Sequence, residues 1–235
     1  MLPRLFAIAM LAIAGSTFAQ SLAPAPPAAG SDDDKFLQII GEIQQLHGKN
    51  KFTEALDKLH EAEKLKPESP VLYNVRGSVF TGMRDFDKAR EAFAKAQSLS
   101  PEAFEPKFNL IELDYVTGKY AEAEAGFAKV LNDFPKLPMQ VRHLTQAKVI
   151  ICQLKQSKLA EAETGAKTFT YMDDTPAYYF VKAAFAFQKG DKADAADWLA
   201  KAGKIYKAED NAPYLDSLME ARWIPSLSVP DQLGK

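Results

Sequence analysis

The sequence predicts an all-α protein built from short helices in consecutive pairs, and three observations indicate this class. Apolar residues recur at intervals of three and four through most of residues 36–211, which is the periodicity of helices with one buried face. Alanines and bulky residues return at a spacing of 34, and prolines return with the same spacing. We therefore expect about eleven helices, arranged as five pairs followed by a C-terminal capping helix.

Residues 69–101 carry the pattern most clearly. Ser69 can cap a first helix with Pro70 at its first position, and the helix should run to about Gly82. The apolar face of the second helix alternates small and large side chains, at Phe86, Ala89, Phe93, Ala96 and Leu99. Because the alanines are small, a neighbouring helix can approach closely and pack over the ring between them. Pro101 then ends the helix.

The same register recurs on both sides of this stretch. Four sets of positions are spaced by 34: Ala55, Ala89 and Ala123; Pro67, Pro101 and Pro135; Phe52, Phe86 and Tyr120; and Leu59, Phe93 and Phe127. A period of 34 with this residue order resembles the tetratricopeptide repeat (TPR) family. The resemblance implies a right-handed α-solenoid of about five TPR-like helix pairs, which serves as a binding scaffold.

The N-terminal residues predict export. Residues 1–19 read as a secretory signal peptide, with Arg4 before a short apolar run and small residues before a cleavage site after Ala19. An uncleaved signal anchor is the alternative. Residues 20–35 read as a Pro/Ala-rich disordered linker, whose last residues, Ser31 and the three aspartates after it, can cap a helix and suit its dipole. A cation site at these aspartates is the other interpretation.

The repeats are expected at about 36–69, 70–103, 104–137, 143–175 and 176–209, within a repeat domain of residues 36–211. The motif around Tyr120 returns around Leu159, at a spacing of 39, so five extra residues lie near Lys136–Met139. They lengthen either the first helix of the fourth repeat or the loop before it, and repeats tolerate such insertions at one edge. Whether this insertion has a role stays open.

Two further positions carry specific expectations. Asp114 stands where the family usually has an inward-facing aromatic residue, so either this helix is rotated or the carboxylate reaches solvent. We favour rotation, because an unpaired buried carboxylate is costly.

Residues 212–235 are expected to form a capping helix opened by Pro213 and a loose tail, with Trp223 folding back onto the fifth repeat.

Composition excludes several classes of function. The formal net charge is −2, so no basic excess favours nucleic-acid binding. Cys152 is the only cysteine and lies in an apolar run, which favours a buried core residue over a reactive thiol. The three histidines show no ligand spacing, and no nucleophile motif or phosphate loop is present. We expect no catalytic residues, no metal, no cofactor and no integral membrane segment in the mature chain.

The resemblance also implies where a partner would bind. In TPR proteins the first helix of each pair lines a concave groove that holds peptides or helices. The groove positions map onto Ile40, Gln44, His47, Asn74, Ser78, Thr81, Phe108, Glu112, Tyr115, Ile151, Phe180 and Phe187. The carboxylate-clamp subfamily needs basic or amide groups where this chain has Ile40, Gln44 and Glu105, which argues against that mode. The remaining groove is apolar and aromatic, and suits an amphipathic helix or an extended segment. The alternative is that its aromatic residues belong to the core.

We therefore predict an exported, periplasmic or secreted scaffold of the bacterial-type envelope that binds another protein, through a peptide or helix segment. The alternative is a structural subunit of a larger envelope or secretion assembly. The sequence does not predict the partner's identity or the oligomeric state.

Overall fold

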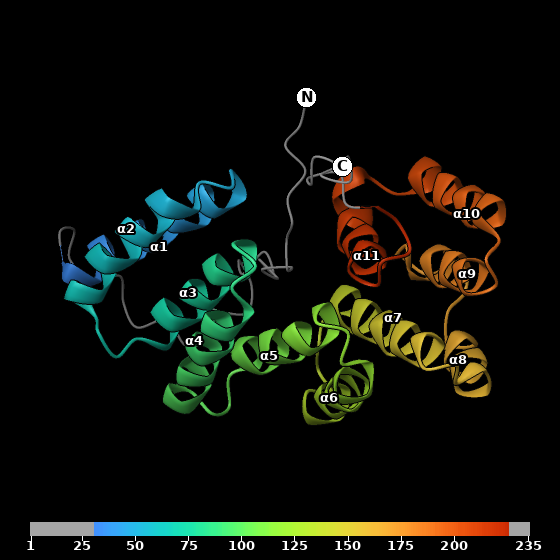
Figure 1. Ribbon diagram of the computed structural model, residues 1–235, viewed down its shortest axis with the longest axis horizontal. Helices are drawn as coiled ribbons and strands as arrows, with labels where there is room; N and C mark the ends of the chain where they lie inside the picture. Colours follow the sequence, from blue (N-terminus) through green and yellow to red (C-terminus); the bar gives the residue numbers. More distant parts are fainter. Residues whose placement is uncertain (1–30, 226–235) are drawn as a thin grey trace, which may run out of the picture. The chain divides into compact units, whose positions relative to one another are not determined.

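The computed structural model describes residues 31–225, and the described chain is helical throughout, with no strand in this range (Figure 1). The eleven helices of the described range are α1 Asp32–Gly48, α2 Phe52–Leu65, α3 Pro70–Gly82, α4 Phe86–Leu99, α5 Phe104–Val116, α6 Tyr120–Asp133, α7 Met139–Lys155, α8 Leu159–Ala166, α9 Ala177–Gln188, α10 Lys192–Ile205 and α11 Ala208–Glu220. The all-helical class and the paired order predicted from the sequence are confirmed. The predicted signal peptide, most of the linker and most of the C-terminal tail lie outside the described residues.

The described chain forms two compact units, residues 31–110 and 111–225, and the boundary falls within α5. In unit 1, α1 packs on α2, α3 packs on α4, and α3 also contacts both helices of the first pair. In unit 2, α7 packs on α6, α8 and α9, while α9 packs on α10 and α11. Each unit therefore has its own core.

Helix starts follow local capping chemistry. Ser31 precedes α1, and its hydroxyl oxygen accepts a hydrogen bond from the Asp34 backbone N–H at 3.2 Å. The three aspartates occupy the first turn, where their charge suits the helix dipole. Ser69, Asp85 and Asp191 cap α3, α4 and α10 in the same way. The capping role expected of Ser31 and the aspartates is confirmed.

One turn recurs in every helix pair. The second residue after each first helix is left-handed, with φ between 57° and 82°, at Asn50, Arg84, Gly118, Ser157 and Gly190. The next residue then donates its N–H back across the helix end, as Lys51 does to the Leu46 carbonyl and Asp85 to the Phe80 carbonyl, both at 2.9 Å. This bond satisfies a carbonyl at the helix end. The repeated turn sets the return of each second helix.

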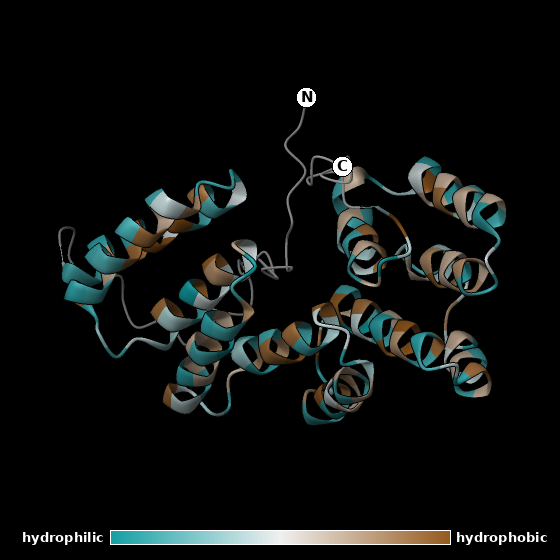
Figure 2. Cartoon of the chain, viewed as in Figure 1, coloured by the Kyte–Doolittle hydropathy of each residue, from teal (hydrophilic) through white to brown (hydrophobic). Residues whose placement is uncertain are grey.

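The small and the bulky side chains that recur every 34 residues form the cores. Ala55, Ala89 and Ala123 are fully buried, as is Phe93. A Cβ added at Gly77 would lie 2.5 Å from the Phe93 ring, so only glycine lets α3 approach α4 this closely. Figure 2 shows brown, hydrophobic residues and teal, hydrophilic residues sharing each helix, as amphipathic helices require.

The extra residues of the fourth pair mainly lengthen its first helix. α7 has 17 residues, whereas α3 and α5 have 13 each. The loop before α7, residues 134–138, is only one residue longer than residues 100–103 before α5. Of the two readings that the spacing left open, the longer helix accounts for nearly all of the insertion.

The C-terminal helix corrects one expectation. α11 begins at Ala208, and Pro213 lies inside it rather than opening it. Glu209 and Asp210 favour the earlier start, because acidic residues in a first turn suit the helix dipole. Beyond the helix, the Trp223 ring stacks on Phe187, with centroids 6.1 Å apart, so the chain does fold back onto α9.

In α5, Tyr115 rather than Asp114 occupies the interior. The Tyr115 ring is fully buried and packs edge-on against Tyr120 and Phe127 of α6. Asp114 is half-buried. The helix therefore presents the neighbouring aromatic residue inward, as a rotated helix would.

Candidate functional site

A hollow on unit 1 is the first candidate site. It encloses about 350 Å³ and is bordered by α1, α3 and the first half of α5. We call it the first-helix hollow, because each of these is the first helix of its pair. Its lining is Gln44, Pro70, Val71, Asn74, Val75, Ser100, Ala103, Phe104, Glu105, Pro106, Phe108 and Asn109. Three of the twelve groove residues predicted from the sequence therefore line it: Gln44, Asn74 and Phe108.

The lining of the first-helix hollow combines apolar surface with ordered amides. The Val71 side chain is 46% exposed, and the Phe104 ring stacks on Phe108 at 5.2 Å. The Asn109 amide nitrogen donates a hydrogen bond to the Asn74 amide oxygen at 2.9 Å, which orients both side chains. Amide groups that are held in place can donate to, or accept from, a bound backbone, while the apolar residues supply contact area.

Four other predicted groove residues of unit 1 are buried in its own structure. Ile40 belongs to the hydrophobic core. His47 is buried, its Nε2 lies 3.1 Å from the Ser78 carbonyl oxygen, and burial lowers the pKa of the imidazole. The Ser78 and Thr81 hydroxyls donate to carbonyls of their own helix. These residues contribute packing and local hydrogen bonds in the chain as it stands.

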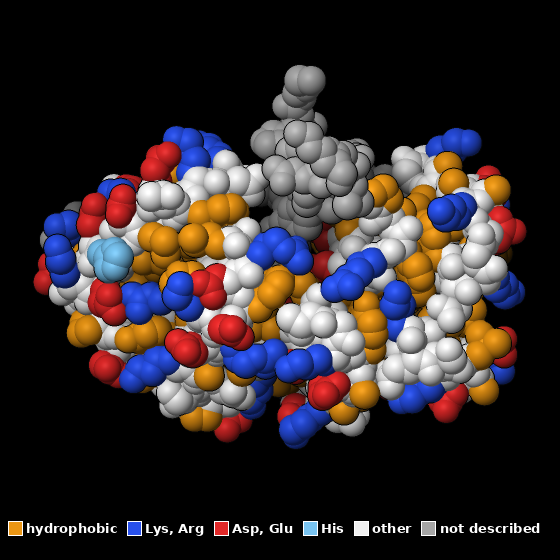
Figure 3. All heavy atoms as spheres, in the orientation of Figure 1, with side chains coloured by type: hydrophobic (Ala, Val, Ile, Leu, Met, Phe, Trp, Pro, Cys, Tyr) orange, Lys and Arg blue, Asp and Glu red, His pale blue; other side chains and the backbone are white. Residues whose placement is uncertain are grey.

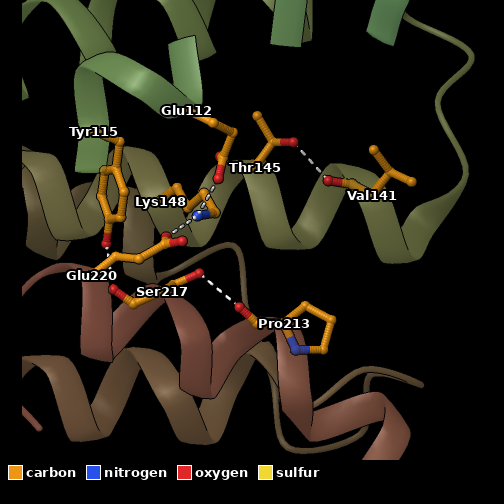
Figure 4. Close-up of polar contacts among 8 residues, drawn as sticks. All are labelled: Glu112, Tyr115, Val141, Thr145, Lys148, Pro213, Ser217 and Glu220. Carbon is orange, nitrogen blue, oxygen red and sulfur yellow. Dashed lines mark hydrogen bonds and ion pairs between the residues drawn. The ribbon is translucent and has the colours of Figure 1, made fainter. Parts of the chain in front are cut away.

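The corresponding surface of unit 2 is covered by α11. We call this surface the first-helix face of unit 2; it consists of the end of α5 together with α7 and α9. Tyr115 donates its hydroxyl to the Ser217 carbonyl at 2.7 Å (Figure 4). Phe180 packs on Tyr214 with ring centroids 5.3 Å apart. Ile151 is buried in α7. Phe187, half-buried, stacks on Trp223 just beyond α11.

A buried charge cluster joins the first-helix face to α11. The Lys148 ammonium donates to Glu112 at 2.9 Å and to Glu220 at 3.1 Å, as the dashed lines in Figure 4 show. The Lys148 and Glu112 side chains are only 3% and 1% exposed. Lys148 also lies 4.4 Å from the centre of the Tyr115 ring. One lysine thus neutralises one of two carboxylates.

The pKa values in this cluster shift for that reason. Burial raises the pKa of Glu220 to about 8 and that of Glu112 above its usual range, although Lys148 opposes both shifts. Burial alone would lower the pKa of Lys148, but the two carboxylates outweigh it and raise that pKa. Lys148 therefore stays charged, while each carboxyl group keeps its proton to a higher pH than an exposed carboxyl group does.

Sequence reasoning missed Lys148 and Glu220. The signal available was a lysine inside the apolar run of residues 147–154, where a charge needs a buried partner. The partners lie 36 and 72 residues away along the chain, in helices whose contacts no periodicity predicts. Glu112 was predicted as a groove residue, and the structure instead shows it fully buried beside Lys148.

Residues 31–225 offer little support for a metal site, a reactive thiol or a membrane-spanning helix. Within residues 31–225, no three His, Cys, Asp or Glu side chains gather where they could hold a metal ion. Cys152 is buried, and burial raises the pKa of its thiol. No helix of the described range is long and apolar enough to cross a membrane. On the face drawn in Figure 3, positive and negative side chains are interspersed with hydrophobic ones.

Comparisons with known proteins agree with this architecture. A family model described as "Tetratricopeptide repeat" matches residues 80–147. No match was found among curated proteins.

Solved structures give longer alignments. The crystal structure of PilW, described as a widely conserved type IV pilus biogenesis factor, is 22% identical with a TM-score of 0.58, over 83% of this chain and 90% of that one. Pseudomonas aeruginosa pilF is 14% identical with a TM-score of 0.59, over 82% and 90%. YrrB, described as a TPR protein with an unusual peptide-binding site, is 16% identical with a TM-score of 0.50, over 82% and 100%. At these identities the likeness shows the fold.

Proposed function

We propose that this chain, which has the fold of tetratricopeptide repeat proteins, is a non-catalytic scaffold that binds a segment of another protein in the first-helix hollow. One observation carries the proposal. Unit 1 leaves an open, partly apolar hollow between three first helices, whereas α11 of the same chain covers the first-helix face of unit 2. The open hollow is the part of the first-helix surface that stays available to a partner.

The lining indicates the chemistry of the bound segment. Val71 and the half-buried Phe104 ring, which stacks on the buried Phe108, offer apolar contact, and the Asn74–Asn109 pair offers amide hydrogen bonds. The exposed Glu105 adds a negative charge at the rim. These features suit an amphipathic helix or extended segment with apolar anchors and a neutral or basic flank. YrrB, which shares the fold, is itself described as having a peptide-binding site.

A matched pair of variants tests this binding site. Val71 and Leu159 are both 46% exposed, but only Val71 lines the hollow. Val71→Glu should place a charge among the apolar contacts and reduce partner recovery by more than about tenfold, since a buried anchor commonly contributes ~2 kcal/mol or more. Leu159→Glu should leave recovery unchanged. The measurement is crosslinked pull-down from the envelope of the source cell, quantified by mass spectrometry.

Thermal melting of both variants provides the control. Because both residues are partly exposed, the two melting temperatures should stay within a few degrees of the unaltered chain. Equal recovery by Val71→Glu and the unaltered chain would remove the hollow as the binding site.

The proposal includes an exported location. The predicted leader of residues 1–19 supports it. PilW and pilF share the fold, and PilW is described as a type IV pilus biogenesis factor. Sequencing the N terminus of the mature protein tests the leader: a start at Gln20 agrees with export and cleavage, and retention of Met1 contradicts it.

A structural subunit of a larger envelope assembly is the second candidate, and the description of PilW favours it. The two candidates differ in how the native protein behaves. An adaptor extracted gently from the envelope should sediment as a small soluble species, whereas an assembly subunit should sediment with a large particle of fixed composition.

A further inference from the structure

The first-helix face of unit 2 holds α11 in the way that a binding face holds a ligand helix. The buried side of α11 consists of Asn211, Tyr214, Ser217 and Leu218, at the spacing of one helix face, and Ala221 just after the helix continues it. We propose that this face is a second helix-binding site, that α11 occupies it as an internal ligand, and that a partner helix with the same aromatic and small side chains, and with a hydrogen-bond acceptor for Lys148, binds there when α11 leaves. This inference is independent of the hollow on unit 1.

The contacts to α11 address features that many helices could supply. Tyr115 donates to the Ser217 carbonyl and Lys155 donates to the Ala221 carbonyl, at 2.7 and 2.9 Å. Both are main-chain acceptors, so they require only that the helix pass close by. The small side chains at these two positions allow that approach. Specific recognition comes from the Tyr214 ring, which packs on Phe180, and from the Glu220 carboxylate at Lys148.

Docking of α11 brings additional negative charge into the cluster, and this charge opposes the favourable contacts that the helix makes. Without α11, the buried Lys148 and Glu112 form a neutral pair on the first-helix face. Docking adds Glu220 and the half-buried Asp216, whereas Lys148 is the lysine for which an ion pair with Glu220 is seen in the described chain. Glu112 Oε1 is buried with no hydrogen-bond partner among the described residues. The cluster therefore sets one lysine against Glu112 alone when α11 is absent, and against additional acidic groups when α11 is docked.

The helix itself adds a second weakness. Pro213 lies in the interior of α11, where it lacks the N–H that would bond to the carbonyl four residues earlier. An isolated helix of 13 residues is marginal in water even without this defect. α11 therefore depends on docking for its structure and should leave the face as a unit.

Several ionisable groups face Glu220, and they determine how docking depends on pH. They are Glu112 and Tyr115 of α5, Tyr120 of α6, Lys148 of α7 and Asp216 of α11, with Cys152, Lys155 and Arg222 close to the cluster. α9 meets α11 with the apolar Phe180. Because Lys148 stays protonated, the carboxylates are the groups that titrate near neutral pH.

The sign of the pH effect follows from the direction of the shifts. Burial raises the pKa of Glu220 to about 8 and that of Asp216 to about 7, so the docked helix binds protons that the free helix releases. Protonation of Glu220 and Asp216 therefore favours docking at low pH, and this favourable effect is lost as the pH rises through about 8. A rise from pH 6 to 9 should therefore open α11 more often.

Hydrogen exchange on the full mature chain tests whether α11 opens by itself. We expect amides of α11 to exchange at least tenfold faster than buried amides of α7 and α9, and the ratio to grow more than about tenfold from pH 6 to 9 after correction for intrinsic exchange. Glu220→Gln keeps an acceptor for Lys148 and removes the charge, so it should slow the opening and flatten the pH dependence. Glu209→Gln, at an exposed site in the first turn of the same helix, is the matched control: it should change the opening by less than about threefold, because a charge near a helix end contributes only ~0.3–1 kcal/mol, and it should leave the pH dependence unchanged. Equal protection of α11 and α9 at all pH values would overturn the proposal.

A labelled peptide tests whether the face accepts a helix from another molecule. The probe is residues 207–224 carrying Glu220→Gln, which avoids the excess charge and should displace α11 from the unaltered chain. Fluorescence anisotropy should show saturable binding, and saturation should speed exchange in α11 at least tenfold. The same peptide with Leu218→Asp should bind at least tenfold more weakly, since Leu218 is fully buried when docked. Absence of binding by the Gln peptide would make α11 a fixed cap and overturn the proposal.

Discussion

Lys148 is the side chain on which unit 2 depends most. It is 3% exposed and holds two carboxylates from different helices. Buried ion pairs add little net stability compared with apolar residues of similar size, but removing one partner leaves the others charged and unpaired. The cluster is therefore sensitive to the loss of its single cation.

Replacing Lys148 with methionine should lower the free energy of unfolding by about 3–5 kcal/mol, because Glu112 and Glu220 lose their cation. The loss should be larger at pH 9 than at pH 6, where the raised pKa values let the carboxylates accept protons. Urea unfolding at both pH values measures it.

Lys201→Met is the matched control, since Lys201 is 45% exposed and pairs with the exposed Asp197 and the Trp198 ring. It should change stability by less than about 0.5 kcal/mol. A Lys148→Met chain as stable as this control would mean that the cluster is not buried as described.

At the residue scale, the sequence predicted packing positions better than polar ones. Ala55, Ala89 and Ala123 were assigned to the interior from their common spacing, and all three are fully buried. Phe108 and Phe180 were predicted as groove residues with core packing as the alternative, and both are buried. The 34-residue period identifies the first helices. It does not distinguish an aromatic ring that packs in the core from one that is exposed in a binding groove.

Each helix pair depends on close approach at small residues. Ala89 lies on α4 where α3 packs against it, and it has no exposed surface. Ala94 lies on the same helix and is exposed. The two alanines therefore differ in environment while sharing their helix propensity.

Ala89→Leu should destabilise unit 1 by roughly 1–3 kcal/mol, because the larger side chain forces α3 and α4 apart. Ala94→Leu should be nearly neutral, since leucine is a good helix former at an exposed site. Denaturant unfolding compares them. An unchanged midpoint for Ala89→Leu would show that the helices do not meet at this residue.

At the element scale, helix starts and turns could largely be predicted, whereas the extent of α11 could not. Capping side chains and glycines act on their own neighbours, so the sequence shows them directly. α11 instead starts five residues before Pro213 and is held by Tyr115, 102 residues away along the chain from Ser217. Such a contact depends on how distant helices pack, which local periodicity does not encode.

At the scale of the molecule, the 34-residue register predicted the all-helical class and the order of pairs, because each repeat packs mainly against its neighbours. The spacing of 39 before the fourth pair also predicted an insertion, and α7 absorbs most of it. The sequence did not predict that the first-helix surface is open in one unit and covered in the other. Unit 1 leaves its first-helix hollow open, and unit 2 covers its first-helix face with the chain's own last helix.

The central claim is that the first-helix hollow binds another protein, and photo-crosslinking in the producing cell tests it most directly. A benzophenone amino acid is placed at Val71 in one full-length chain and at the equally exposed Leu159 in another. Our account predicts a discrete adduct of one partner from Val71, reduced when Asn74→Asp disturbs the amide pair with Asn109. It predicts no such adduct from Leu159. The same adduct from both positions, or an adduct from Leu159 alone, would contradict it.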